Sequence, residues 1–250
     1  MKFVRFRKDN SCSYGLLEDD KVKKIEGDIF KDYEITNCCY DINDVDVLVP
    51  CQPSKIVCVG LNYKGHVQEV NKALPEEPVI FLKPPSAALP HKGKIVKPAI
   101  SSRVDYEGEV GLVIGKPAKN IRPEEAYSYI LGATCFNDVT ARDLQSKDGQ
   151  WTRSKSFDTF APFGPCIATD LNYDNLSIEL LLNGEVKQKS NTSDLIFNVG
   201  QLVSFISQVM VLMPGDVIAT GTPSGIGPMS SGDTVQVKVE GVGVLENYVI

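Results

Sequence analysis

The chain has 250 residues, of which 42% are hydrophobic, and its 26 basic against 32 acidic side chains give a net charge of −6. This length and composition suffice for a buried core, so they exclude a disordered chain. The acidic balance argues against a nucleic-acid-binding protein, and no apolar stretch approaches the roughly 20 residues of a membrane span. The start, MKFVRFRKDN, has no apolar segment like those of secretory signals, so we expect a cytoplasmic protein without nucleic-acid or membrane partners.

Residues 1–50 are predicted to form a small N-terminal β domain. Residues 3–7 partly alternate between apolar and basic side chains, residues 14–17 lead into an acidic turn, and residues 22–25 form the returning strand. Pro50 and Pro53 then interrupt the pattern, so we expect a separate catalytic domain from residue 55 to residue 250.

The main domain is predicted to be rich in strands. Strands are expected at residues 55–60, 78–83, 104–114, 131–136, 177–182, 185–189 and 234–239. The Asn183-Gly184 pair between two of these runs predicts a two-residue hairpin. Helices are expected to be few, with one at residues 123–129 and another that has an apolar face formed by Leu202, Phe205, Ile206 and Val209. The sequence therefore predicts a mainly β (α+β) fold built on a barrel or folded sheet.

The seven cysteines do not suggest a disulfide framework or a zinc site. Their number is odd, no C-x-x-C pair is present, and the chain has only two histidines. Cys58 and Cys135 lie in apolar runs, so we expect reduced thiols that pack as small core residues.

Two glutamates stand out in the strand predicted at residues 104–114. Side chains two residues apart share one face of a strand, so Glu107 and Glu109 are expected to point the same way. Two buried carboxylates repel each other unless a positive group lies between them, and a hard divalent cation is the usual solution. Asp138, which follows the next apolar run, is the candidate third ligand. The alternative is an exposed edge strand with ordinary solvated acids.

Further polar groups suggest acid–base chemistry and anion binding. In a helix Glu69 would lie beside His66 and could orient it as a general base, although a surface histidine with an incidental acid is the alternative. Lys155, in an aromatic-rich stretch expected to be irregular, could stabilise an anionic substrate or a developing enolate, or it could be a solvated lysine. The glycine-rich loop at 221–227 could present backbone N–H groups and the Thr222 hydroxyl to a carboxylate.

Six short segments, taken in their order, resemble the fumarylacetoacetate hydrolase (FAH) family. They are GLNY at 60–63, FLKP at 81–84, DYEGE at 105–109, NDVTARD at 137–143, KSFD at 155–158 and GTPSGIG at 221–227. The resemblance covers residues 55 to 250, and the first 50 residues resemble the N-terminal segment of longer bacterial members.

This resemblance implies a β-sheet roll with few helices, a homodimer and a magnesium or manganese ion (Mg²⁺ or Mn²⁺). It implies that Glu107, Glu109 and Asp138 are the metal ligands, and that His66, Glu69 and Lys155 are the catalytic residues. The residues implied to bind the 2-oxo acid substrate are Asn62, Tyr63, Lys83, Arg142, Gln145 and Thr222.

The implied reaction is metal-dependent hydrolysis of the C–C bond of a 2,4-dioxo acid, of the acylpyruvate or fumarylpyruvate type, through a stabilised enolate. The same groups would suit an oxaloacetate decarboxylase or tautomerase, or an isomerase or decarboxylase of 2-hydroxy-dienedioates from aromatic degradation. Leu61 bears on this choice, because acylpyruvases of the family often have Gly-Arg-Asn-Tyr where this chain has Gly-Leu-Asn-Tyr. The leucine form resembles the dienedioate isomerases and the decarboxylases of aromatic degradation. A binding protein without catalytic activity is disfavoured, because it would not need the His66–Glu69 pair.

Overall fold

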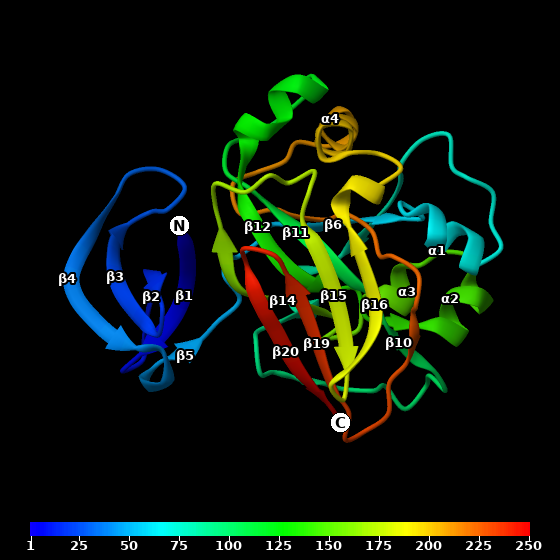
Figure 1. Ribbon diagram of the computed structural model, residues 1–250, viewed down its shortest axis with the longest axis horizontal. Helices are drawn as coiled ribbons and strands as arrows, with labels where there is room; N and C mark the ends of the chain where they lie inside the picture. Colours follow the sequence, from blue (N-terminus) through cyan, green and yellow to red (C-terminus); the bar gives the residue numbers. More distant parts are fainter.

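A large mixed sheet forms most of the β structure of the computed structural model, which describes residues 1–250 (Figure 1). Its strands are β1 (Lys2–Lys8), β2 (Ser11–Glu18), β3 (Lys21–Gly27), β4 (Tyr33–Asp41), β5 (Asp46–Val47), β6 (Ile56–Gly60), β7 (Val79–Lys83), β8 (Ala88–Leu89), β11 (Gly108–Ile114), β12 (Ile130–Asn137), β14 (Ala161–Ala168) and β17 (Val217–Ala219). The strand order is β4-β3-β2-β1-β14-β12-β11-β17-β6-β7, and β5 and β8 pair with β1 and β14. The N-terminal strands thus continue the sheet of the main body.

Two smaller sheets complete the β structure. One contains β16 (Glu185–Asn191), β15 (Ser177–Leu182), β19 (Thr234–Val239), β20 (Gly243–Val249) and β9 (Lys94–Ile95), in that order. The other contains β13 (Thr140–Ala141), β10 (Val104–Tyr106) and β18 (Gly227–Pro228). The predicted mainly β fold is confirmed.

The helices are short, and three of them lie together. The α-helices are α1 (Lys64–Glu69), α2 (Arg142–Asp148), α3 (Thr152–Lys155) and α4 (Val199–Val209), and the 3-10 helices are η1 (Ile42–Asp44), η2 (Pro85–Ala87), η3 (Pro123–Tyr129) and η4 (Thr192–Asp194). Figure 1 shows α1, α2 and α3 grouped on the side of the main body away from the N-terminal strands. None of the helices is long and apolar enough to cross a membrane.

Local patterns with a short-range cause were predicted correctly. The 183–184 hairpin is present, and Asn183 and Gly184 have φ angles of 53° and 81°, as a type I′ turn requires. The strand predicted at 234–239 is β19. All seven cysteines are unpaired, and Cys58 and Cys135 are buried in apolar clusters.

Several expectations about individual elements were wrong. The strand predicted at 104–114 is broken at Glu107, because β10 pairs with β13 and β18 whereas β11 pairs with β12 and β17. The stretch around Lys155 contains α3 instead of being irregular, whereas the helix predicted at 123–129 is present as a 3-10 helix. In α4, Val203 is buried while Val209 is 56% exposed, so the apolar face is rotated from the predicted one.

One of the two hydrophobic clusters joins the N-terminal strands to the main body. It includes Phe3, Leu16 and Ile25 from the first three strands, together with Phe136 and Phe163 from β12 and β14. β1 pairs with β14 at its first residues, so backbone hydrogen bonds and side-chain packing connect the same two regions. The larger cluster lies between the main sheet, the five-stranded sheet and α4.

Candidate active site

Three acidic side chains converge where β10 gives way to β11. Ligand oxygens of Glu107, Glu109 and Asp138 lie within 4.8 Å of one another, and the three residues are 5%, 1% and 1% exposed. Antiparallel pairing of β11 with β12 sets Gly108 opposite Asn137, which brings the following Asp138 to the glutamates. The Asp138 N–H also donates to the Glu107 carbonyl at 2.8 Å. The alternative of an exposed edge strand is therefore ruled out.

Two buried lysines balance these carboxylates. Lys155 Nζ lies 2.6 Å from Asp138 Oδ2 and 3.0 Å from Glu107 Oε2, and it sits over the Phe81 ring, 5.0 Å from the centroid. Lys83 Nζ lies 2.7 Å from Asp138 Oδ1 and donates to the carbonyls of Val139, Lys155 and Phe160. The structure thus places Lys155 in the acidic cluster and Lys83 behind it, with its donors directed at backbone.

The electrostatic environment shifts the pKa values of the two glutamates in opposite directions. Burial would raise the pKa of Glu107, but the ammonium of Lys155 and the guanidinium of Arg142 hold that pKa below its usual value. Burial raises the pKa of Glu109 well above its usual value, and the charges of Asp138 and Glu107 add to this effect. Without a further cation the site therefore favours a proton on Glu109.

The glycine-rich loop holds Glu109 from the other side. Gly221 N–H donates to Glu109 Oε2 at 2.8 Å, and its φ of 108° suits glycine alone. Thr222 Oγ1 donates to the Gly108 carbonyl at 2.9 Å and accepts from Gln188 Nε2 at 2.8 Å. The loop thus directs a backbone N–H at a carboxylate of the protein itself, and it leaves Thr222 facing the pocket.

His66 and Glu69 lie together on α1, as their spacing predicts. His66 Nδ1 is 3.1 Å from Glu69 Oε2, and the other Glu69 oxygen accepts from Gly225 N–H at 2.9 Å. Glu69 therefore connects α1 to the glycine-rich loop and fixes the ring of His66. The contact at Nδ1 leaves Nε2 as the ring atom that can take a proton.

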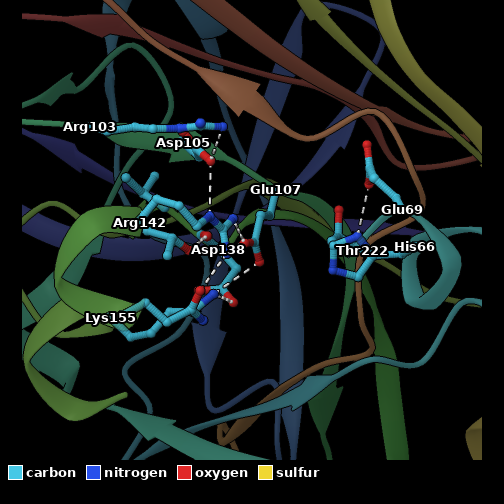
Figure 2. Close-up of polar contacts among 12 residues, drawn as sticks. His66, Glu69, Arg103, Asp105, Glu107, Asp138, Arg142, Lys155 and Thr222 are labelled. Carbon is cyan, nitrogen blue, oxygen red and sulfur yellow. Dashed lines mark hydrogen bonds and ion pairs between the residues drawn. The ribbon is translucent and has the colours of Figure 1, made fainter. Parts of the chain in front are cut away.

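Arg142, at the start of α2, connects the acidic cluster to its surroundings. Its Nη2 contacts Glu107 Oε1, its Nη1 donates to Gln145 Oε1 at 2.5 Å, and its Nε donates to Asp105 Oδ2 at 2.9 Å. Figure 2 shows these ion pairs continuing from Arg103 through Asp105 and Arg142 to the acidic cluster, with His66 and Glu69 to one side. Neither Asp105 nor Arg103 was predicted to be a site residue from the sequence.

The acidic cluster, Lys155, Arg142 and His66 line one pocket with a volume of about 110 Å³. Its polar lining consists of His66, Lys72, Glu107, Glu109, Asp138, Arg142, Gln145, Lys155 and Thr222, and its other walls are Val59, Gly60, Leu61, Val70, Phe81 and Trp151. Asn62, Tyr63 and Lys83 are buried but do not line the pocket. Asn62 instead bonds to the backbone of Thr220 and Phe197, and thereby supports the loop that carries Thr222.

Comparison with known families agrees with this arrangement. The family described as fumarylacetoacetate (FAA) hydrolase C-terminal matches residues 55–250, and one described as Rv2993c-like, N-terminal, matches residues 1–50. The chain belongs to the fumarylacetoacetate hydrolase family. Members of this family are enzymes, and their named activities include isomerases, tautomerases and hydrolases.

Three relatives illustrate this range of activities. The crystal structure of a 5-carboxymethyl-2-hydroxymuconate delta-isomerase from Mycobacterium smegmatis has a TM-score of 0.94 and 43% identity, covering 100% of this chain and 99% of that one. A mitochondrial oxaloacetate tautomerase of Rattus norvegicus is 41% identical over 83% of this chain and 70% of its own length. A maleylpyruvate hydrolase from Sphingobium sp. SYK-6, in complex with manganese(II) and pyruvate, has a TM-score of 0.85 and 27% identity over 100% and 99%.

The FAH-family site suits a hard divalent cation. Its candidate donors are carboxylate oxygens only, which is the ligand set that Mg²⁺ and Mn²⁺ prefer. Lys83, Lys155 and Arg142 form ion pairs with Asp138 and Glu107, whereas Glu109 has no cationic partner. A bound divalent ion would supply the missing positive charge beside Glu109, and its own charge would favour an anionic ligand in the pocket.

Proposed function

We propose that this protein is a divalent-metal-dependent enzyme that enolises a 2-oxo acid at C3, and so acts as a tautomerase or isomerase. The convergence of Glu107, Glu109 and Asp138 with the Lys155 ammonium carries this proposal. Bound Mg²⁺ or Mn²⁺ would supply Lewis acidity toward the carboxylate and the 2-oxo group of the substrate. Lys155, enclosed and almost without solvent contact, would stabilise the negative charge that develops on the 2-oxo group as the C3 proton leaves.

The similarity to named enzymes supports enolisation over other reactions. The rat relative is named a tautomerase and the M. smegmatis structure an isomerase, and both are more than 40% identical to this chain. Solved structures that are named hydrolases are 33% and 27% identical. Tautomerisation and isomerisation move a proton within the substrate and, unlike hydrolysis, consume no water.

Hydrolysis of a 2,4-dioxo acid is the second candidate, and the His66–Glu69 pair favours it. His66 lines the pocket opposite the acidic cluster, and Glu69 fixes its orientation. Nε2 of His66 could take a proton from water while the oxygen adds to the C4 carbonyl. The C3–C4 bond would then break, its electron pair would move to C3 as the pyruvate enolate, and the enolate would be protonated.

An assay with three substrates separates these candidates. Purified protein loaded with Mg²⁺ or Mn²⁺ is mixed with oxaloacetate, acetylpyruvate or fumarylpyruvate, and the products are followed by NMR. We expect rapid interconversion of the keto and enol forms of oxaloacetate, lost on chelation and restored by the metal ion. Cleavage of acetylpyruvate or fumarylpyruvate to pyruvate would support the hydrolase candidate, whereas release of CO₂ would indicate a decarboxylase. Full activity in the presence of excess chelator would contradict the proposal.

A homodimer is a further proposal, which rests on the family resemblance. Light scattering after gel filtration would test it, since the chain mass is 27.4 kDa and a dimer has twice that value.

A further inference from the structure

Three acids alternate along the segment that forms the site, but only two of them join the acidic cluster. Asp105, Glu107 and Glu109 occupy every second position, as side chains on one strand face do. Glu107 and Glu109 converge with Asp138, whereas Asp105 does not belong to that group. Asp105 is nevertheless fully buried, and a buried carboxylate without partners would be strongly destabilising.

Two arginines satisfy this carboxylate from opposite sides. Arg103 donates from Nε to Asp105 Oδ1 at 2.8 Å and from Nη2 to Oδ2 at 3.1 Å. Arg142 donates from Nε to Oδ2 at 2.9 Å. The side chain of Arg103 is 50% exposed and that of Arg142 is 19% exposed. Asp105 thus lies between a solvent-facing arginine and the arginine of the pocket (Figure 2).

The contact at Nε decides where the rest of the Arg142 guanidinium points. The group is planar and its donors have fixed directions, so the contact at Nε fixes the plane of the guanidinium and limits where its two Nη groups can point. Nη1 then meets Gln145 and Nη2 meets Glu107, and all three side chains line the pocket. Arg142 presents donors there in the geometry that suits a carboxylate or an oxo-acid.

We propose that Asp105 is a positioning residue, which acts through Arg142 to orient this guanidinium toward the anionic end of the substrate. The inference rests on the proposed function, because it assumes that a 2-oxo acid binds in this pocket. Asp105 itself touches neither the pocket nor the candidate metal ligands' oxygens. The competing interpretation is that the Arg103–Asp105–Arg142 ion pairs only stabilise the fold.

Direct binding measurements with oxalate as the probe distinguish these interpretations. The parent, Asp105→Asn and Arg142→Met proteins and the double variant are loaded with Mn²⁺, and the Kd values for Mn²⁺ and oxalate are measured by calorimetry. We expect Asp105→Asn to weaken oxalate binding about ten- to hundredfold, the range for a lost hydrogen bond between charged groups. Mn²⁺ binding should change less than oxalate binding. In the Arg142→Met background, Asp105→Asn should cost no further oxalate affinity, because its effect passes through Arg142.

Two further variants guard against a simple folding defect. Arg103→Met removes the outer partner but keeps the Asp105–Arg142 contact, so its oxalate affinity should stay within about threefold of the parent. Asp105→Glu keeps the charge that neutralises the arginines but displaces the carboxylate. It should therefore fold where Asp105→Asn does not, and still bind oxalate more weakly.

Each outcome of this set decides the question. An Asp105 variant that folds and binds oxalate like the parent would overturn the proposal, and so would equal effects of Asp105→Asn with and without Arg142. The same holds if Arg103→Met weakens oxalate binding as much as Asp105→Asn. A parent protein that binds neither Mn²⁺ nor oxalate would contradict the proposed function itself, and this result is recognisable before any variant is made.

Discussion

Replacing Lys155 by methionine would test the charge balance of the site, because methionine keeps much of the stem and removes the ammonium group. The Nζ atom lies 2.6 Å from Asp138 and 3.0 Å from Glu107, and the residue is 2% exposed. Coulomb's law with an effective dielectric constant of about 20 gives roughly 6 kcal/mol for the shorter contact, before the opposing desolvation. Removing one partner of a buried ion pair costs about 3–5 kcal/mol.

We expect a loss near the lower end of that range, because Lys83 and Arg142 still face the two carboxylates. For a chain of 250 residues, about 3 kcal/mol lowers the melting temperature of the metal-free protein by roughly 6–12 °C. Mn²⁺ binding should become tighter, since Lys155 no longer competes with the ion for Asp138 and Glu107. Enolisation should nevertheless become about 10²–10³ times slower, as when one preorganised donor is removed.

Thermal melts with and without Mn²⁺, calorimetric titration and the NMR assay measure these three effects. Lys189→Met is the matched control, because its Nζ makes a 2.8 Å ion pair with Glu179 on the solvent-exposed surface. The control should leave stability, metal affinity and rate unchanged. A Lys155→Met protein that melts like the parent and binds Mn²⁺ with equal affinity would refute the described charge balance.

Three further predictions concern the remaining groups. If the protein hydrolyses a 2,4-dioxo acid, His66→Ala should slow cleavage by about 10²–10⁴ in a kinetic assay while oxalate affinity stays within a few-fold. Burial and the charge of Asp138 raise the pKa of Glu109 above its ordinary 4.5, so Mn²⁺ should bind more tightly as the pH rises through that raised pKa. The proton that Glu109 releases on binding Mn²⁺ can be measured by calorimetry in buffers of different ionisation enthalpy. Over the same interval the folded metal-free protein holds a proton that the unfolded chain has lost, so its stability in thermal melts should fall as the pH rises. Gly221→Ala, whose new Cβ would lie 2.8 Å from Asn62 Cβ, should cost about 1–3 kcal/mol or more and weaken oxalate binding, whereas Gly232→Ala has a similar φ in open space and should cost less.

Features that depend on neighbouring residues could be predicted from the sequence. The Asn183-Gly184 hairpin follows from turn geometry, and the spacing of His66 and Glu69 follows from the helix repeat. The proximity of Glu107 and Glu109 was expected from their spacing, although the strand is interrupted at Glu107. β4 was missed because none of its side chains is fully buried, so its sequence lacks an alternating pattern.

Features that depend on contacts distant in sequence could not be predicted. Arg142 meets Asp105 across 37 positions, and Glu69 meets Gly225 across 156. Lys83 reads as an ordinary lysine at the end of a strand, and only the folded chain surrounds its ammonium with three carbonyls and Asp138. The periodic pattern of a sequence records which faces are buried, but not which charges meet there.

The connection between β1 and β14 has a consequence for how the chain can be divided. β1 covers one edge of β14, and Phe3 fills part of the cluster that contains Phe136 and Phe163. A protein cut after residue 50 would expose an unpaired strand edge and an opened apolar surface, the two features that promote aggregation. The N-terminal strands therefore shield the edge of β14 and the apolar cluster from solvent. A recombinant fragment of residues 55–250 should precipitate more readily than the whole chain.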